Sequence, residues 1–369
     1  MIKVLHCYKT YYPDTFGGIE QVIYQLSEGK GSENISSTVY THTPNKSDES
    51  MLEHHYCVRT KTMFEVASTP FSFESFSKFR SLAEQADIIH YHYPYPFMDV
   101  LHFSLRDRKP SIVSYHSDIV KQKLLLKLYS PLMNRFLNSV DRIVAASPNY
   151  VESSPVLQKF KGKVEVIPYG LNKDFYKNED HSVLDKWSAR FPGGFFLFIG
   201  TFRYYKGLHI LIDAAKKSDY PIVIVGAGPI EEELKDQAKK LNIQNIHFLG
   251  ALADVDKSAL LELCTCLVFP SHLRSEAFGI SLLEGALYSK PLISSEIGTG
   301  TTYINIDGVT GLVVPPSDSA ALRKAMDDIW FNPQKALSFG KAAHARFEKL
   351  FTAEKMIESY TALYKSLLK

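Results

Sequence analysis

Short apolar runs that alternate with helix-like stretches recur along this chain and restrict its fold more than any other feature. Five of them lie between residues 195 and 295, with the sequences FFLFIG, YPIVIVG, NIHFLG, CLVFP and KPLISS. A short apolar run without polar alternation is typical of a strand that is buried on both faces of a parallel sheet. Strands that alternate with helices build α/β domains. The second half of the chain is therefore predicted to be such a domain.

The first half of the chain shows the same alternation. Its apolar runs are Ile2–Tyr8, Asp87–His92, Ser111–Tyr115, Asp141–Ala146 and Lys163–Ile167. Two facing Rossmann-like domains are the simplest architecture for two such series. Pro168-Tyr169-Gly170 closes the first series, and a polar segment ending in Pro192-Gly193-Gly194 follows it. We therefore expect domains at 1–172 and 194–352, a linker at 173–193, and two or three amphipathic helices after Ser317, with the last at 353–369.

The composition of the 369 residues excludes several functional classes. Hydrophobic residues make up 45% of the chain and charged residues 22%, and the net charge is only +2, so we expect no nucleic-acid partner. Four cysteines are too few for a disulfide framework in a chain of this size. The chain starts directly with a strand-like run and has no apolar run of about 20 residues, so we expect neither a signal peptide nor a membrane span. These features favour a cytoplasmic location.

One stretch, PSHLRSEAFGISLLEG (Pro270–Gly285), combines a loop and a helix start after a predicted strand. Glu276 lies in the loop, Phe278-Gly279-Ile280 opens the helix, and Glu284 lies within it. The first N–H groups of a helix have no partner within the helix, and together with the helix dipole they attract anions. The stretch is therefore a candidate anion site flanked by two carboxylates. A solvent-facing pair of Glu residues is the alternative.

Two cations follow another predicted strand, in GTFRYYKG (Gly200–Gly207). Arg203 offers a planar fork for phosphate oxygens, and Lys206 offers a compact point charge. Together they could neutralise a diphosphate that gains charge as it leaves. Two solvated surface cations are the alternative.

Gly226-Ala227-Gly228 follows a strand and precedes a helix, as in a dinucleotide-binding motif. Glu231 stands where the third glycine belongs, and the next strand ends without the acidic residue that would hold a ribose. We therefore predict no nicotinamide-dependent dehydrogenase. Close approach of a nucleotide to Gly226–Pro229 remains available.

Two patterns suggest a metal ion only superficially. Asp254-Val255-Asp256 has the D-x-D spacing, but it precedes a helix, where Asp residues cap the end and complement the dipole. His90 and His92 share one face of a strand, but no carboxylate or cysteine stands at a useful spacing. We expect no metal at either position.

Gly17-Gly18 lies between the first strand and a helix whose apolar residues recur at helical spacing. Glycines at this place let the backbone approach a ligand closely, and the helix start favours an anion. A flexible loop before a helix is the alternative.

Together, these motifs resemble those of the retaining GT-B glycosyltransferases of family 4, and the resemblance covers essentially the whole chain. The matching elements are Gly17-Gly18, His116 with Asp118, Pro168-Tyr169-Gly170, Gly200-x-x-Arg203-x-x-Lys206-Gly207 and Glu276-Ala-Phe-Gly-Ile-Ser-Leu-Leu-Glu284. The last has the E-x7-E spacing of the family. The resemblance implies the GT-B fold, with two facing Rossmann-like domains, a sugar nucleotide bound mainly by the C-terminal one, and a last helix that crosses back onto the N-terminal domain.

The resemblance also implies roles for single residues. Arg203 and Lys206 would hold the diphosphate, Glu284 would bind the ribose, and Glu276 would orient the donor sugar. The helix start around Glu276 would help through Phe278, Gly279, Ile280 and Ser281. Gly18, beside Gly17, would approach the phosphate from the other domain, His116 would line the sugar pocket, and Leu252 would lie near the base. Gly226 and Gly228 complete the expected nucleotide contacts.

The activity that the resemblance implies is metal-independent transfer of a hexose with retention, to a growing, lipid-linked glycan. The chain is similar to bacterial mannosyltransferases of surface-polysaccharide and lipopolysaccharide (O-antigen) assembly, so mannose from GDP-mannose is the expected donor. A UDP-sugar is the alternative donor. A sugar-nucleotide epimerase or a phosphorylase of the same shape, and a non-catalytic sugar-nucleotide-binding module, are the alternative functions.

A basic and aromatic surface is expected in the first domain. Between Arg106 and Lys163 the chain has 11 Lys or Arg and 4 Asp or Glu, a local excess of +7. Lys121–Tyr129 mixes basic and apolar residues, and Phe71–Arg80 adds aromatic ones. This pattern is typical of a surface that meets anionic lipid, so we expect peripheral contact with the inner membrane. A solvated basic helix face is the alternative.

Overall fold

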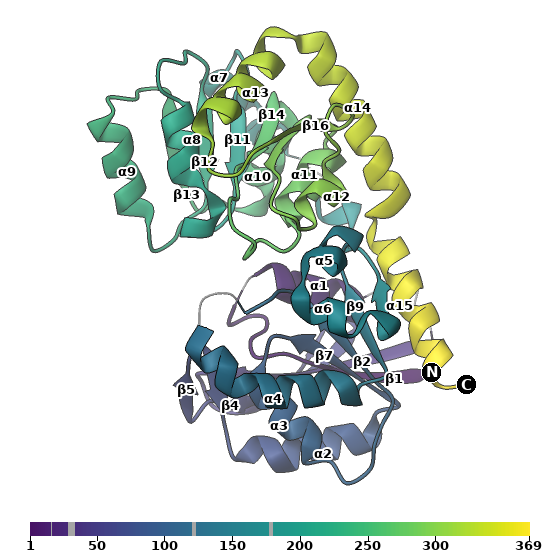
Figure 1. The fold of residues 1–369 in the computed structure, drawn as a ribbon. Coiled ribbons are helices and arrows are strands. Elements are labelled where there is room, and N and C mark those ends of the chain that lie inside the picture. The colour runs from purple at the N-terminus through teal and green to yellow at the C-terminus, as the bar shows by residue number, and fades with distance from the viewer. Residues whose placement is uncertain (16, 29–33, 120–122, 177–179) are drawn as a thin grey trace. The chain divides into compact units, whose positions relative to one another are not determined.

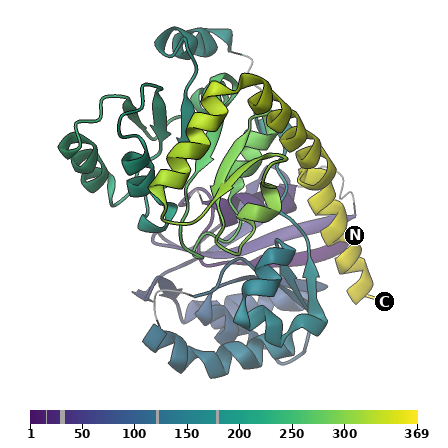
Figure 2. The ribbon, with the colours of Figure 1, turned by 45° about the horizontal axis from the view of Figure 1, so that its top comes forward.

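The structure, a computed structural model, describes residues 1–15, 17–28, 34–119, 123–176 and 180–369 and contains two compact units. The first unit comprises Met1–Gly170 and Ala353–Lys369, and the second comprises Leu171–Thr352 (Figures 1 and 2). The last helix of the chain therefore belongs to the first unit. Each unit is an α/β structure with a mainly parallel sheet.

The sheet of the first unit has eight strands in the order β10-β9-β8-β7-β1-β2-β4-β3, and all neighbours are parallel except β3 and β4. Its strands are β1 (Ile2–Cys7), β2 (Ile35–Thr43), β3 (Asp48–Leu52), β4 (His55–Lys61), β7 (Ile88–Tyr93), β8 (Ser111–Tyr115), β9 (Arg142–Ala145) and β10 (Val164–Val166). A separate hairpin consists of β5 (Phe64–Val66) and β6 (Thr69–Phe71). The helices are α1 (Gly18–Glu28), α2 (Glu74–Gln85), α3 (Pro96–Phe103), α4 (Lys123–Ser139), α5 (Pro148–Ser153), α6 (Pro155–Lys159), η1 (Lys161–Lys163) and α15 (Ala353–Leu367).

The second unit has a six-stranded, fully parallel sheet in the order β13-β12-β11-β14-β15-β16. Its strands are β11 (Phe196–Ile199), β12 (Ile222–Val225), β13 (Ile246–Gly250), β14 (Cys266–Phe269), β15 (Leu292–Ser295) and β16 (Gly311–Val314). Its helices are η2 (Lys173–Tyr176), α7 (His181–Arg190), η3 (Tyr204–Lys206), α8 (Leu208–Ala214), α9 (Glu231–Lys240), α10 (Asp254–Leu263), α11 (Ile280–Leu287), α12 (Thr301–Ile304), α13 (Ser319–Phe331) and α14 (Pro333–Leu350).

The central strands are the apolar runs that the sequence predicted, and their burial is nearly complete. Phe196, Phe198 and Ile224 are fully buried and pack with Leu211 of α8 and Met326 of α13 in the core of the second unit. Because parallel strands end at the same edge of a sheet, the loops after β11, β12 and β14 emerge together there. Strand order therefore decides which loop residues can meet.

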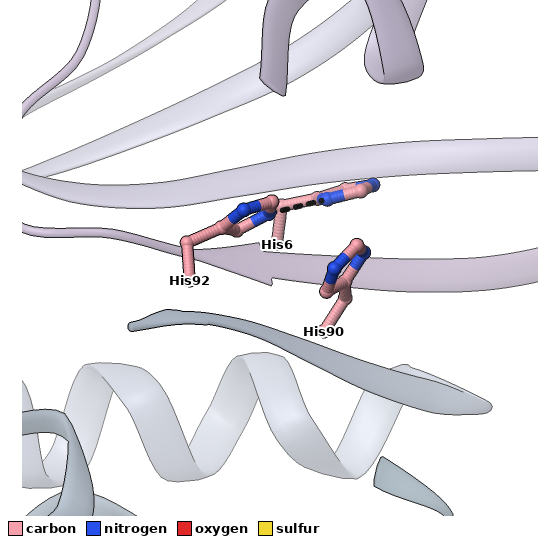
Figure 3. Close-up of side chains that lie close together, drawn as sticks. All are labelled: His6, His90 and His92. Carbon is pink, nitrogen blue, oxygen red and sulfur yellow. Dashed lines mark hydrogen bonds between the residues drawn. The ribbon is translucent and has the colours of Figure 1, made fainter. Parts of the chain in front are cut away.

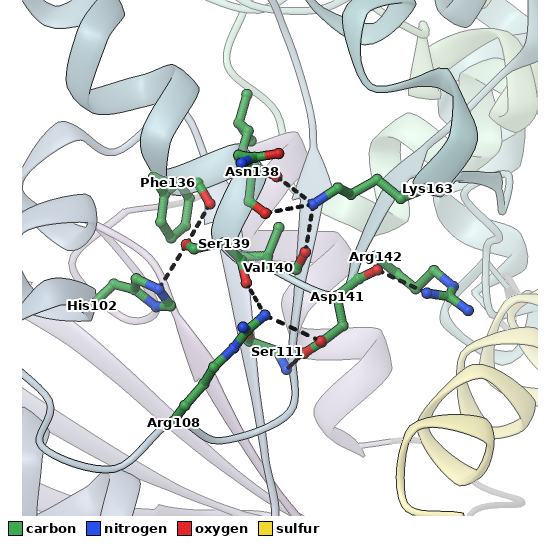
Figure 4. Close-up of polar contacts among 11 residues, drawn as sticks. His102, Arg108, Ser111, Phe136, Asn138, Ser139, Val140, Asp141, Arg142 and Lys163 are labelled. Atoms are coloured by element: carbon green, nitrogen blue, oxygen red, sulfur yellow. Dashed lines mark hydrogen bonds and ion pairs between the residues drawn. The ribbon is translucent and has the colours of Figure 1, made fainter.

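Basic side chains cap the end of α4 in the first unit (Figure 4). Lys163 Nζ donates to the carbonyl oxygens of Leu137 at 3.1 Å, Asn138 at 2.8 Å and Val140 at 2.9 Å. Arg108 donates to the Ser139 carbonyl oxygen, and Ser111 N donates to Asp141 at 2.9 Å. The last carbonyls of a helix have no partner within it, and cations there also complement its dipole. These contacts hold α4 beside β8 and β9.

The segment 173–193, expected to be a linker, contains α7 and belongs to the second unit, although residues 177–179 lie outside the described ranges. Trp187 of α7 donates from Nε1 to Asp256 of α10 at 2.8 Å. Asp254 and Asp256 lie in the first turn of α10, where they complement the dipole. The N-cap itself is Ala253, so the prediction that these Asp residues cap the helix was wrong. No helix among the described residues is long and apolar enough to cross a membrane.

Candidate active site

A buried ion pair lies where β11 and β14 end in the second unit. Lys206 of η3 donates from Nζ to Glu276 Oε2, and the two side chains are only 13% and 11% exposed. β11 and β14 are neighbours in the sheet, so the loops after them meet although 70 residues separate the pair. Burial by itself would lower the pKa of Lys206, but the Glu276 carboxylate more than offsets this and raises that pKa above its ordinary value. Lys206 therefore keeps its charge although it is buried.

The turn that carries Lys206 is fixed by close backbone contacts. Gly207 has φ 72°, and a Cβ there would lie 2.0 Å from the Pro270 carbonyl oxygen, so only glycine fits. His272, just after β14, binds the same turn: its N–H donates to the Tyr205 carbonyl at 3.0 Å, and its Nε2 lies 3.0 Å from the Tyr204 carbonyl. The sequence analysis did not single out His272. Its position three residues after a strand end was the available signal.

Arg203, the second predicted phosphate ligand, is exposed and directly precedes η3. Its guanidinium has no hydrogen bond or ion pair with any residue that the structure describes. Arg203 and Lys206 therefore differ: one cation is solvated at the surface of the unit, and the other is paired and buried. Both emerge from the loop after β11.

The helix start that follows Glu276 is held by the packing of α11 against β14, β15 and α14. Gly279 precedes α11 with φ 100°, and a Cβ there would lie 3.1 Å from a Phe269 ring carbon. Ser281 donates from Oγ to the Ile199 carbonyl at 2.9 Å. Phe278 is 3% exposed and Ile280 is half-buried, so neither side chain is free for a polar ligand. What this start offers an anion is its backbone N–H groups and its dipole.

Glu284, inside α11, is half-buried and bound by a tyrosine. Tyr176 of η2 donates its hydroxyl to Glu284 Oε1 at 3.0 Å. Burial raises the pKa of Glu284, and the bond from Tyr176 works against that rise. Tyr176 lies in the segment expected to be a linker, so the sequence analysis missed it. Glu276 and Glu284 therefore have different partners and do not form an acid/base couple.

Gly226 and Gly228 have a structural explanation that needs no ligand. A Cβ at Gly226 would lie 2.0 Å from the Gly200 carbonyl oxygen, and one at Gly228 would lie 2.4 Å from that of Phe202. The loops after β11 and β12 thus touch through their backbones, and Phe202 N donates to the Ala227 carbonyl at 2.9 Å. Leu252, after β13, is half-buried.

In the first unit, Gly17 and Gly18 lie at the start of α1, as predicted. Glu20 turns its carboxylate back over them: a Cβ at Gly17 would lie 2.4 Å from Glu20 Oε2. The Thr10 and Thr15 hydroxyls each donate to Glu20 Oε1 at 2.9 Å, and Glu20 is 8% exposed. The helix start therefore already holds a carboxylate of its own, which the sequence analysis did not anticipate.

His116 follows β8 and is 4% exposed. Its Nε2 lies 2.9 Å from His92 Nδ1, and its Nδ1 lies 2.5 Å from the Tyr169 hydroxyl. Burial lowers the pKa of His116 to about 3. Both ring nitrogens are thus in use within the first unit, and a sugar could bind the imidazole nitrogens only by replacing one of these partners. Asp118, two residues on, accepts from the Tyr115 and Ser154 hydroxyls at 2.9 and 2.7 Å.

His6, His90 and His92 form a buried group in which one ring nitrogen of each residue lies within 4.8 Å of one ring nitrogen of the other two (Figure 3). The parallel register of β1 and β7 places His6 beside His90. Five of the six ring nitrogens are already hydrogen-bonded: both of His90, to Tyr364 and Ser114, both of His92, and Nδ1 of His6. The His90 and His92 rings also stack at 4.2 Å instead of aiming at one point. This arrangement serves hydrogen bonding better than metal binding.

The chain is similar to known glycosyltransferases along its whole length. Residues 186–346 match the family described as Glycosyl transferases group 1, and residues 16–175 match Glycosyltransferase Family 4. The chain is 52% identical to the O-antigen chain mannosyltransferase C of Escherichia coli, over 100% of this chain and 99% of that one. It is 56% identical to the D-rhamnosyltransferase WbpZ of Pseudomonas aeruginosa, over 95% and 93% of the two chains.

Two solved structures share the fold at low sequence identity. Sucrose-phosphate synthase from Thermosynechococcus elongatus superposes with a TM-score of 0.81 at 20% identity, over 100% of this chain and 99% of that one. Anabaena HepE, solved with UDP and glucose, gives a TM-score of 0.79 at 19% identity, over 99% and 100%. Both alignments span the two Rossmann-like units. The chain therefore belongs to glycosyltransferase family 4 and is a glycosyltransferase with the GT-B fold.

Proposed function

We propose that this glycosyltransferase moves mannose from GDP-mannose, with retention, to a growing, lipid-linked glycan of bacterial surface-polysaccharide synthesis. The observation that carries the proposal is the buried Lys206–Glu276 pair beside the start of α11. A pair of this kind places a fixed positive charge and a sugar-binding carboxylate within one site. The names of the two curated relatives, a mannosyltransferase and a D-rhamnosyltransferase, support a hexose or deoxyhexose donor.

In the proposed site, the diphosphate lies against Lys206, Arg203 and the N–H groups that open α11. These groups stabilise the charge that grows on the leaving phosphate, so transfer without a metal ion is part of the proposal. Glu276 orients the sugar, and Glu284 accepts hydrogen bonds from the ribose hydroxyls. The solvated state of Arg203 supports its role, since it can swing to a phosphate without losing a partner.

Retention with the leaving phosphate accepting the proton of the acceptor is the mechanism that we propose. Glycosidases use two carboxylates that flank the scissile bond. Here Glu276 pairs with Lys206, and Glu284 binds Tyr176, so neither is placed as such a base. In the first unit, Gly17, Gly18 and His116 stay proposed contacts of the donor, and Leu252, Gly226 and Gly228 stay proposed neighbours of the nucleotide.

We further propose that the first unit docks on the cytoplasmic face of the inner membrane, where a lipid-linked acceptor would be found. Exposed apolar side chains support this. Phe73 is 70% exposed and Leu128 is 77% exposed, and both the β5–β6 hairpin and α4 pack against α3. The exposed apolar side chains in and around the hairpin and in α4 are Met63, Phe64, Val66, Phe73, Leu125 and Leu128. Lys121 and Gln122 of the predicted basic stretch lie outside the described residues.

The docking proposal predicts binding to vesicles that depends on charge and on these apolar side chains. Wild-type protein should co-sediment with vesicles that contain anionic lipid at low salt and less so at high salt, because ions screen the attraction. Phe73→Ser combined with Leu128→Ser should reduce binding at both salt concentrations. No binding of the wild type at low salt would refute docking and would leave the donor site untouched.

The donor proposal is tested by measuring nucleoside diphosphate release and sugar transfer with GDP-mannose, GDP-D-rhamnose and UDP-glucose. GDP-mannose should give the highest kcat/KM. A higher value with UDP-glucose would favour the alternative donor. Conversion of the donor to a new sugar without acceptor would indicate an epimerase, and calorimetric binding without turnover over any acceptor would indicate a binding module.

A further inference from the structure

Three buried histidines and one tyrosine of the first unit form a single chain of hydrogen bonds. His6 Nδ1 lies 3.2 Å from His92 Nε2, His92 Nδ1 lies 2.9 Å from His116 Nε2, and His116 Nδ1 lies 2.5 Å from the Tyr169 hydroxyl. The four residues are 1%, 1%, 4% and 7% exposed. They come from β1, from β7, and from the segments that follow β8 and β10.

In each hydrogen bond of this chain, the Nδ1 of one histidine faces the Nε2 of the next, and the last Nδ1 faces the Tyr169 hydroxyl. A neutral imidazole carries one N–H, and each link needs one hydrogen. If His92 donates from Nε2 to His6, its Nδ1 is bare and must accept from His116 Nε2–H. The His116 Nδ1 is then bare and accepts from Tyr169. If His6 donates instead, all three rings carry the proton on Nδ1. The neutral chain therefore has two states only, and all three histidines share one tautomer in each.

The geometry favours neutral rings. The three imidazoles are hydrogen-bonded to one another and to a phenol, and among the residues that the structure describes no carboxylate hydrogen-bonds any of them. Burial lowers the pKa of His6 and of His116 to about 3 each, and lowers the pKa of His92 well below its ordinary value.

The tyrosine end of the chain selects one of the two states. A phenol hydroxyl is a good donor, and a bare imidazole nitrogen is a stronger base than a phenol oxygen. We infer that Tyr169 donates to His116 Nδ1 and so fixes His116, His92 and His6 together as Nε2–H tautomers, which makes Tyr169 a positioning residue for His116. Tyr169 directly precedes Gly170, where the first segment of this unit ends. The tautomers of the three histidines are therefore fixed by a residue of the backbone segment that leaves the unit.

The effect on transfer rests on the proposed function, in which His116 lines the donor site, whereas the tautomer assignment does not. Tyr169→Phe removes the hydroxyl that selects the state. The matched control is Tyr364→Phe: Tyr364 is 3% exposed, and its hydroxyl lies 2.7 Å from the Nδ1 of His90, outside the chain. Both variants remove one buried hydroxyl from a histidine Nδ1.

The experiment is nitrogen-15 NMR of histidine-labelled full-length protein, combined with donor kinetics. In the wild type, His6, His92 and His116 should each carry the proton on Nε2. Tyr169→Phe should populate both tautomers in all three rings and lower kcat roughly tenfold, with little change in donor KM. Tyr364→Phe should leave the three tautomers and kcat as in the wild type.

The wild-type spectrum alone can overturn the inference, if the three rings have different tautomers or carry the proton on Nδ1. The test therefore remains available even if the Tyr169→Phe protein fails to fold. An unchanged spectrum in folded Tyr169→Phe would overturn it as well. If the tautomers change but kcat does not, Tyr169 does not position His116 for catalysis. If the wild type transfers no sugar from any donor, the proposed function fails, but the spectrum still tests the tautomer assignment of the three histidines.

Discussion

The two units build similar parallel sheets but place different chemistry where their strands end. In the first unit, the groups in contact around β1, β7 and β8 are imidazoles and hydroxyls that satisfy one another without charge. In the second unit, a lysine and a carboxylate form a buried ion pair at the ends of β11 and β14, and the carboxylate raises the pKa of the lysine. A buried charge is costly unless it is paired, whereas neutral polar groups need only hydrogen bonds. At these strand ends the second unit therefore holds a buried ion pair, and the first holds a network of neutral hydrogen bonds.

The largest expected effect comes from breaking the charged pair. Lys206→Met should lower kcat for transfer by a factor of roughly 10²–10³, because the leaving diphosphate loses its fixed cation. Glu276→Gln should have a comparable effect, since it leaves Lys206 buried without its partner. Steady-state kinetics with GDP-mannose measure both.

Lys216→Met is the matched control for the charged pair, because Lys216 forms an ion pair with Asp213 at 2.8 Å with side chains that are 47% and 37% exposed. Surface pairs contribute little, so its kcat should match the wild type. Transfer at the wild-type rate by Lys206→Met would show that the difference between the units is structural only.

Gly207→Ala should destabilise the turn that carries Lys206. Gly207 has φ 72°, and a Cβ would meet the Pro270 carbonyl oxygen at 2.0 Å, so we expect a loss of about 2–3 kcal/mol in the free energy of unfolding. Gly193→Ala is the control, since a Cβ there has no neighbour within 4 Å. Denaturant titration of both variants checks the prediction, and equal losses would refute it.

Lowering the pH should destabilise the first unit more than the second. His6 and His116 have folded-state pKa values lowered to about 3, so the unfolded chain binds more protons than the folded chain between pH 6.5 and about 3. Stability of the first unit is therefore fully present above about pH 6.5 and falls as the pH is lowered, by about 1.4 kcal/mol per pH unit for each such histidine.

Hydrogen exchange followed by mass spectrometry can measure this difference strand by strand between pH 7.5 and 5. Protection of β1, β7 and β8 should fall with pH faster than that of β11 and β14, because β1 carries His6 and His116 follows β8, whereas β11 and β14 contain no histidine. Parallel loss in both units would contradict the prediction.

The smallest effect is expected at Tyr176. Tyr176→Phe removes one hydrogen bond to Glu284 and should raise the donor KM about fivefold, equivalent to about 1 kcal/mol, with kcat nearly unchanged. Tyr220→Phe is the control, because it also removes one hydrogen bond from a tyrosine hydroxyl to a carboxylate, that of Asp327 at 2.9 Å. A fall in kcat with unchanged KM would place Glu284 in the chemical step instead of ribose binding.

Much of the fold followed from local sequence patterns. The runs that became β1, β7, β8, β11, β12 and β14 were predicted within one or two residues, and the three helices after Ser317 are confirmed as α13, α14 and α15. Residues 35–71 were not assigned, because β2 to β6 there mix polar and apolar residues, and β3 and the hairpin are antiparallel. The aromatic stretch after Phe71 also divides in a way that periodicity did not reveal: Phe71 and Phe76 pack on Phe97, at 4.8 and 5.8 Å, and Phe73 is exposed.

The sequence by itself determined the fold class, the family, and the residue types at the proposed donor site, because strand–helix alternation and the spacing of Glu276 and Glu284 are local properties of the chain. Only the tertiary structure decided which of these side chains contact one another. Strand order brings Lys206 to Glu276 across 70 residues, and Tyr169 to His116 across 53, and no local pattern encodes either contact. Burial and neighbours then set the pKa of each group. Lys206 keeps its charge because the Glu276 carboxylate lies beside it, whereas burial among neutral groups lowers the pKa of His116.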